Sequence, residues 1–188
     1  MDNRERIPDE AASLFAEKGY HAVGIQEIVN RSEITKPTLY HYFGSKEGLY
    51  LSCLERDFVP LMKELSALAA GDEDIFVKMQ KILHFMLRKG DIRRNFIQLY
   101  LTLCSAPPQS EEIRIGGMFL RQLERILEDM FIEASFKHGN MRGRHRDYSA
   151  TFMGLINTSL SRLLRNEFEI SGENVYRTIH QFAHGIYS

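Results

Sequence analysis

The sequence predicts an all-α protein, because apolar residues recur at helical spacing in almost every segment while strand signals are weak throughout. Glycines and prolines divide these segments into about nine helices. Two short helices near the N-terminus are joined by a three- or four-residue turn, which is the arrangement of a helix-turn-helix. The 188 residues allow a module of about 50 residues attached to a larger helical domain.

The first predicted helix ends at Lys18, because Gly19 is suited to a left-handed C-terminal cap. Pro8 marks the first turn of this helix or kinks it. One apolar stripe holds the helix on its neighbours and consists of Ile7, Ala11, Leu14 and Phe15.

The second predicted helix begins after Gly24, and Glu27 is placed to reach back to the backbone at its start. Its buried side consists of Ile25, Ile28 and Val29. A short turn over Ser32 to Ile34 follows. Thr35 is a good N-cap for a third, brief helix, which ends near Phe43 and Gly44.

Ser45 caps a fourth helix that runs to about Ala69 and is kinked by Pro60. Two further helices precede the stop at residues 107–108. Their stripes are Ile75, Met79, Ile82, Leu83 and Met86, and then Phe96, Leu99, Tyr100 and Leu103.

A long helix over about Glu111 to Phe136 follows, and the stretch from Lys137 to Arg146 is predicted to be a loop because it is rich in glycine and arginine. Two helices complete the chain. One carries Phe152, Leu155, Ile156, Leu160, Leu163 and Leu164, and the other carries Val175, Ile179, Phe182 and Ile186.

The composition excludes several classes of protein. Hydrophobic residues make up 44% and charged residues 26%, as in ordinary globular proteins. No apolar run approaches the ~18 residues of a membrane span, so we expect a cytoplasmic protein. Cys53 and Cys104 lack the spacing of a zinc or redox motif and are expected to be free buried thiols. The seven histidines form no metal-ligand pattern, and we expect neither a metal nor a cofactor.

The charge balance by itself gives no sign of nucleic-acid binding. The net charge is −1, and residues 1–50 hold six basic residues against eight acidic ones. Many DNA-binding domains are basic. Any charge that contacts DNA must therefore be concentrated locally.

The third predicted helix has two different sides. Leu39 and Phe43 lie on the side that packs against the first two helices. The outward side suits base edges and phosphates, since it offers a cation, rings with polar tips and a flat proline: Lys36, Pro37, Tyr40 and His41. Lys46 opens the next helix, where its charge and the helix-start amides suit one phosphate. The alternative is an ordinary solvated, charged face.

Residues 14–49 resemble the DNA-binding signature of the tetracycline-repressor (TetR) family of regulators, most specifically in TKPTLYHYF at 35–43 and in Ser45-Lys46-Glu47. The resemblance implies that bases or the adjoining backbone are contacted by Lys36, Pro37, Thr38 and Tyr40. It also implies that phosphates are approached by Thr35, His41, Tyr42 and Lys46, joined by Gln26. The chain departs from the family at three places: Gly24 replaces a Ser or Thr cap, Ser32-Glu33 replaces Ala-Gly, and Pro8 replaces an aliphatic residue.

The resemblance further implies a helix-turn-helix domain over residues 1–46 and a ligand-sensing and dimerisation domain over 47–188. A repressor of this type binds a roughly palindromic double-stranded DNA operator as a homodimer and is released by a small-molecule effector. The last two helices would form the dimer interface through the stripes at 152–164 and 175–186. The alternative is that these stripes face the core of one subunit. No effector-binding residues are assigned.

Two other classes of function are considered. An all-helical enzyme needs a nucleophile with its base or a ligand cluster, and neither is found, so no catalytic residue is assigned. A protein-interaction module whose helix-turn-helix no longer binds DNA fits the near-neutral N-terminal region. A gel-shift experiment separates that module from a regulator.

Overall fold

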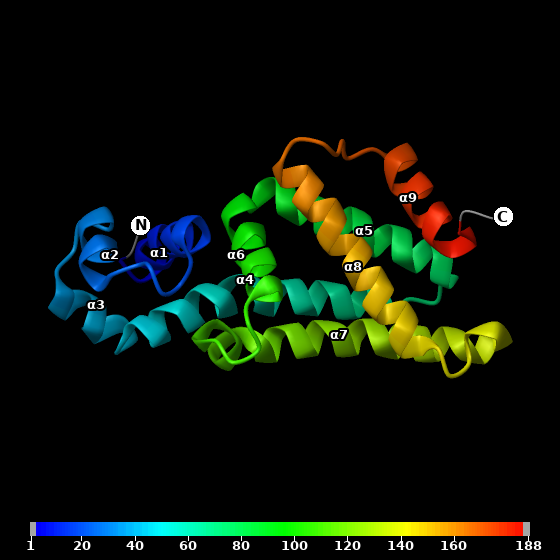
Figure 1. Ribbon diagram of the computed structural model, residues 1–188, viewed down its shortest axis with the longest axis horizontal. Helices are drawn as coiled ribbons and strands as arrows, with labels where there is room; N and C mark the ends of the chain where they lie inside the picture. Colours follow the sequence, from blue (N-terminus) through cyan, green and yellow to red (C-terminus); the bar gives the residue numbers. More distant parts are fainter. Residues whose placement is uncertain (1–2, 186–188) are drawn as a thin grey trace. The chain divides into compact units, whose positions relative to one another are not determined.

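The computed structural model describes residues 3–185, without the side chains of residues 3–5 and 140. Within that range it contains nine α-helices, one 3-10 turn and no strand. The all-α prediction is thus confirmed (Figure 1). The helices are α1 (Asn3–Lys18), α2 (Ile25–Arg31), α3 (Lys36–Phe43), α4 (Lys46–Ala69), α5 (Ile75–Ile92), α6 (Arg94–Ser105), α7 (Glu111–Lys137), α8 (His145–Leu164) and α9 (Gly172–His184).

Most helix ends lie where the sequence predicts them, with differences at two places. Pro8 lies well inside α1 rather than in its first turn. The predicted loop over 137–146 contains the 3-10 turn η1 (Gly139–Met141), and α8 begins at His145. The turn forms because successive amides there bond back to carbonyls three residues earlier, as Met141 N–H does to His138 at 3.0 Å.

The chain packs into two units. The first contains residues up to 60 together with 95–120, and the second contains 61–94 together with the chain from 121 onward. Helices α4 and α7 therefore contribute residues to both units. This division describes packing, and the functional boundary after residue 46 stays a prediction.

Aromatic rings form the core of the first unit. The ring of Tyr50 lies 5.0 Å from Phe15 and 4.9 Å from Tyr20, centroid to centroid. Further along α4, Phe58 packs edge-on against Phe96 and stacks on Phe119. Burial of this much aromatic surface fixes α1, α4, α6 and α7 against one another.

Cys53 belongs to this core, as expected of a buried free thiol. Its thiol donates to the carbonyl of Pro8 at 3.4 Å. Burial raises the pKa of Cys53 to about 12, so the nucleophilic thiolate is scarce at neutral pH. Cys104 is only half-buried, which differs from the expectation.

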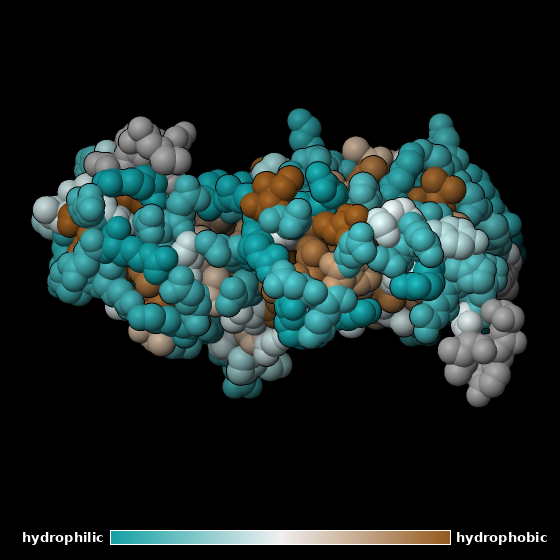
Figure 2. Space-filling view, turned by 90° about the horizontal axis from the view of Figure 1, so that it is seen from above, coloured by the Kyte–Doolittle hydropathy of each residue, from teal (hydrophilic) through white to brown (hydrophobic). Residues whose placement is uncertain are grey.

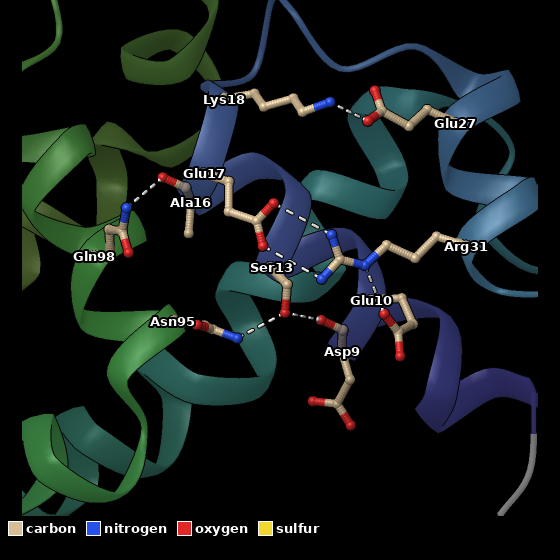
Figure 3. Close-up of polar contacts among 10 residues, drawn as sticks. All are labelled: Asp9, Glu10, Ser13, Ala16, Glu17, Lys18, Glu27, Arg31, Asn95 and Gln98. Carbon is tan, nitrogen blue, oxygen red and sulfur yellow. Dashed lines mark hydrogen bonds and ion pairs between the residues drawn. The ribbon is translucent and has the colours of Figure 1, made fainter.

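Helix α6 is fastened to α1 by hydrogen bonds (Figure 3). The amide of Asn95 donates to the hydroxyl of Ser13 at 2.6 Å, and that hydroxyl donates to the carbonyl of Asp9 at 3.1 Å. The amide of Gln98 donates to the carbonyl of Ala16 at 2.9 Å. These directional bonds fix the position of α6 along α1.

In the second unit, α8 and α9 both pack against α5. The apolar stripes of α8 and α9 largely face this core, since the following side chains are buried: Phe152, Ile156, Leu160, Leu163, Val175 and Ile179. Leu155, Leu164 and Phe182 are half-buried, and Ile186 lies outside the described residues. The core alternative therefore holds for most of both stripes, and a dimer interface on α8 and α9 has to use their outward sides.

No helix in the described part of the chain is long and apolar enough to cross a membrane. Figure 2 shows one face of the molecule, on which hydrophobic groups reach the surface among predominantly hydrophilic ones. Exposed large apolar side chains of the second unit include Val77, Ile92, Phe136 and Tyr176.

The turn between α2 and α3 contains two unfavourable features. Glu33 adopts a left-handed conformation with φ at 51°, which is costly for a residue with a Cβ. Ser32 is only 1% exposed, and its hydroxyl makes no hydrogen bond with any described residue. Glycine and alanine at these positions would remove both problems, which accounts physically for the Ala-Gly pair common in the TetR signature.

The double substitution Ser32→Ala with Glu33→Gly is expected to raise the free energy of unfolding by about 1 to 2 kcal/mol, because it relieves the left-handed Cβ and the unsatisfied buried hydroxyl. Urea unfolding followed by circular dichroism measures this change. Glu33→Ala is the matched control, since it removes the same carboxylate but keeps the Cβ. An unchanged midpoint for the double variant would contradict this account of the turn.

Candidate nucleic-acid interface

Helix α3 is closed at both ends by its own residues. At the start, the hydroxyl of Thr35 accepts a hydrogen bond from the backbone N–H of Thr38 at 3.4 Å and lies 2.8 Å from the Thr38 hydroxyl. At the end, Gly44 has φ at 71° and donates to the carbonyl of Tyr40 at 2.9 Å. The predicted N-cap and C-terminal glycine are both confirmed, so the short helix starts and stops at defined residues.

The inward side of α3 is packed against its neighbours. Leu39 is fully buried and Phe43 is half-buried, as predicted. The first turn of α4 passes very close to the end of α3, because a Cβ at Gly48 would lie 2.1 Å from the carbonyl oxygen of Phe43. Only glycine permits this close approach. The contact between the first turn of α4 and the end of α3 holds the two helices at a fixed angle.

The outward side of α3 carries the side chains predicted to contact DNA. Tyr40 is 46% exposed and Tyr42 is 39% exposed. The other exposed members of the predicted set are Gln26, Thr35, Lys36, Pro37 and His41, whereas Thr38 is half-buried. Gln26 donates to the side-chain oxygen of Asn30 at 2.9 Å. The exposure of these residues agrees with the prediction, and their contact with DNA stays a prediction.

Lys46 lies differently from the other members of this set. It is half-buried, and its ammonium lies over the ring of Tyr20, 4.3 Å from the centroid. Burial lowers the pKa of Lys46, while the charges of Glu111 and Glu112 act in the opposite direction. The phosphate contact predicted for Lys46 therefore requires its ammonium to leave the Tyr20 ring.

Most cations of the first unit form ion pairs with nearby carboxylates, and Figure 3 shows two of them, Arg31 and Lys18. Arg31 donates to Glu10 at 3.0 Å and to both oxygens of Glu17 at 3.3 Å. Lys18 pairs with Glu27, which therefore does not fold back onto the backbone as predicted. Further pairs join Arg6 to Glu33, Arg56 to Asp9, and Arg114 to Glu47.

Two lysines of the helix-turn-helix region form no ion pair with a described carboxylate. Among the described side chains of residues 6–50, Lys36 and Lys46 are the lysines and arginines with no carboxylate at ion-pair distance. The total charge of the region is close to zero, but Lys36 and Lys46 give it local positive charge. Lys36 projects from α3 itself, so positive charge is available where a phosphate or base edge would lie.

Sequence reasoning missed the part of the site contributed by α7. The guanidinium of Arg114 forms a two-pronged ion pair with Glu47, at 2.8 and 2.7 Å. His21 lies 3.6 Å from Glu111 and 3.4 Å from Glu112. These partners are far apart in the chain, and no local spacing pattern reveals them. No group of three or more potential metal ligands is found among the described residues.

Comparisons with known proteins place these residues in a family context. Residues 7–53 match the family model described as bacterial regulatory proteins, tetR family. A stretch of 55 residues, 29% of this chain and 25% of the relative, is 42% identical to the HTH-type transcriptional activator FasR of Mycolicibacterium smegmatis. A stretch of 131 residues, 69% of this chain and 68% of the relative, is 28% identical to IcaR of Staphylococcus epidermidis, named as a negative regulator of the icaADBC biofilm operon.

The fold is also similar to that of solved regulators. The crystal structure of the transcriptional regulator FadR from Bacillus subtilis, in complex with stearoyl-CoA, has a TM-score of 0.79 and is 16% identical, covering 97% of this chain and 99% of that one. At this identity the similarity concerns the fold alone. The chain spans 25% of the length of FasR and 68% of the length of IcaR, so similarity to these relatives does not extend over their whole length.

Substitution of Lys36 by alanine is expected to weaken binding to any DNA duplex and to reduce the slope of log affinity against log salt by about 1, because one phosphate charge is no longer neutralised. Fluorescence anisotropy with a labelled duplex, measured at several salt concentrations, gives this slope. Lys18→Ala is the matched control, since Lys18 is already paired with Glu27 and should leave the slope unchanged. Equal slopes for Lys36→Ala and the unaltered protein would show that Lys36 contacts no phosphate.

Proposed function

We propose that the chain, whose residues 7–53 match the tetR family of bacterial regulatory proteins, is a DNA-binding transcriptional repressor that a small-molecule effector releases from its operator. The observation that carries this proposal is the outward side of α3. A short, capped helix is packed firmly on its support and presents Lys36, Pro37 and Tyr40 with no competing partner for the Lys36 charge. A recognition helix in the major groove needs this combination of rigidity and exposed polar groups.

Each exposed residue of the site has a proposed role. Tyr40 and Lys36 are proposed to contact base edges through the phenol and the ammonium, and Pro37 is proposed to offer an apolar surface to a thymine methyl group. Thr35, His41, Tyr42 and Gln26 supply hydroxyl, imidazole and amide groups that suit phosphate oxygens. Repression is favoured because IcaR, similar over more than two thirds of this chain, is named as a negative regulator.

We infer that the protein binds DNA as a homodimer through α8 and α9. One recognition helix reads only a few base pairs, and a two-fold dimer on a roughly palindromic operator doubles the readout. Because the apolar stripes face inward, the interface is assigned to the outward side of these helices. On α8 that side carries the small residues Ala150, Thr151, Gly154 and Thr158, which allow close helix packing.

The effector is proposed to act through α4, which begins beside α3 and continues into the second unit past Pro60. A ligand that binds one arrangement of α4 more tightly shifts the population toward it and so changes DNA affinity. The stearoyl-CoA complex of FadR shows that a regulator with this fold has been found with a small molecule bound.

No enzymatic role is proposed. A repressor acts where the chromosome is, so we assign the protein to the bacterial cytoplasm.

Selection of fragments from a random pool by the purified protein is expected to yield a roughly palindromic duplex. On that duplex, Tyr40→Ala should cost on the order of 1 to 3 kcal/mol in binding free energy, because a base contact is lost, and should cost much less on unrelated DNA. Lys46→Ala should weaken both duplexes alike. A pool that yields no enriched sequence, together with no gel shift on any duplex, would support the interaction-module alternative.

Gly154→Arg is expected to convert the dimer to a monomer without loss of fold. A Cβ at Gly154 meets no atom within 4 Å in the subunit, so the larger side chain is tolerated there but blocks a partner helix. Analytical ultracentrifugation measures the oligomeric state, and circular dichroism monitors the fold. Ala67→Arg, at an exposed position of α4, is the matched control and should remain dimeric. A dimeric Gly154→Arg protein would place the interface elsewhere.

A further inference from the structure

Glu112, in the first turn of α7, is a buried acid with no assigned role. It is 8% exposed, and its Oε2 atom is inaccessible and makes no hydrogen bond with any described group. A buried carboxylate in this condition is costly unless cations lie nearby. Its surroundings therefore decide how the charge is tolerated.

Two cationic or titratable groups of the helix-turn-helix region surround this acid. The Nε2 atom of His21 lies 3.4 Å from Glu112, and its Nδ1 atom lies 3.6 Å from Glu111. The ammonium of Lys46 lies 4.3 Å from the centroid of the Tyr20 ring; burial lowers the pKa of Lys46, and the charges of Glu111 and Glu112 act in the opposite direction. The charged or titratable groups from every element packed here are Tyr20 and His21 from the α1–α2 loop, Lys46, Glu47 and Tyr50 from α4, and Glu111, Glu112 and Arg114 from α7.

The other charges of this cluster are already committed. Arg114 forms its two-pronged pair with Glu47, which lowers the pKa of Glu47 and keeps both partners charged. Burial raises the pKa values of Tyr20 and Tyr50, so both phenols are neutral near pH 7. When His21 is neutral, Lys46 is the cation left to balance Glu112.

We propose that Glu112 and the Tyr20 ring hold Lys46 away from DNA, and that a proton taken up by His21 replaces Lys46 beside Glu112 when Lys46 moves to a phosphate. This inference rests on the proposed DNA-binding function. The proton comes from solvent, and no covalent bond changes. Glu112, Tyr20 and His21 are positioning residues for Lys46 and do not contact DNA themselves.

The direction of the pH dependence follows from linkage. In this proposal the DNA-bound state carries one more proton at His21 than the free state, so binding strengthens as pH falls and weakens as pH rises. Without a proton at His21, release of Lys46 leaves Glu112 buried without a cation. Neutralising Glu112 should remove that obstacle.

The first experiment measures the affinity of four proteins for a fluorescein-labelled 30-base-pair duplex of random sequence at pH 8: the unaltered protein, E112Q, K46Q and the double variant. Random sequence suffices because a phosphate contact is independent of sequence. E112Q is expected to bind more tightly, on the order of fivefold, but only when Lys46 is present. In the K46Q background the gain should disappear.

Matched controls separate this effect from a general loss of negative charge. Glu128 lies further along α7 and contacts His145 at 3.4 Å and Arg146 at 3.0 Å. E128Q therefore removes one carboxylate charge from the same helix, and that carboxylate also contacts a histidine. This variant should leave DNA affinity unchanged. Thermal unfolding by circular dichroism confirms that each variant is folded. A gain for E112Q that persists in K46Q would overturn the role given to Lys46.

The second experiment tests the proton exchange at pH 6 and pH 8. All proteins carry H41Q, because His41 on α3 is itself a proposed phosphate contact and its contribution to any pH dependence has to be removed. With His21 present, binding should be about fivefold tighter at pH 6 than at pH 8, and H21Q should reduce this ratio toward one. Calorimetry in buffers of different ionisation enthalpy should show proton uptake only with His21 present. Equal ratios with and without His21 would overturn the exchange, whereas no binding of any duplex by any of these proteins would refute the proposed function itself.

Discussion

The ring of Tyr20 joins the core of the first unit to its proposed DNA-binding surface. One part of the ring packs against Tyr50 and Phe15, and the ammonium of Lys46 lies over it. The aromatic core thereby fixes α1 against α4, and α3 is in turn held against α4 by the close approach at Gly48. The orientation of α3, the proposed recognition helix, therefore depends on packing by residues that are not themselves proposed to contact DNA.

Local chemistry made much of the fold predictable. Thr35 caps α3 because a hydroxyl at that position satisfies an amide that has no helical partner, and Gly44 ends the helix because it accepts a left-handed conformation. The spacing of Leu39 and Phe43 identified the inward side of α3, because helical periodicity can be seen in the local sequence. The direct role of the outward residues remains a proposal.

The features that sequence reasoning missed depend on contacts between distant segments. Glu27 had a plausible local partner in the backbone, but packing of α1 on α2 brought Lys18 to it instead. Lys46 was predicted to contact a phosphate, yet its ammonium lies over the ring of Tyr20. The stripe from Phe152 to Leu163 suited either a core or a dimer interface, and only the position of α5 settled that most of it is core.

The pairing of Arg31 with Glu10 and Glu17 has a consequence for the behaviour of the protein in a cell. A scaffold whose cations are already neutralised offers few contacts to phosphates of arbitrary sequence, and bulk chromosomal DNA holds such a protein weakly. Fewer copies are then sequestered at the roughly 10⁶ or more competing genomic sites. A regulator built in this way can keep its operator occupied at a low copy number, and a modest change in abundance changes transcription directly.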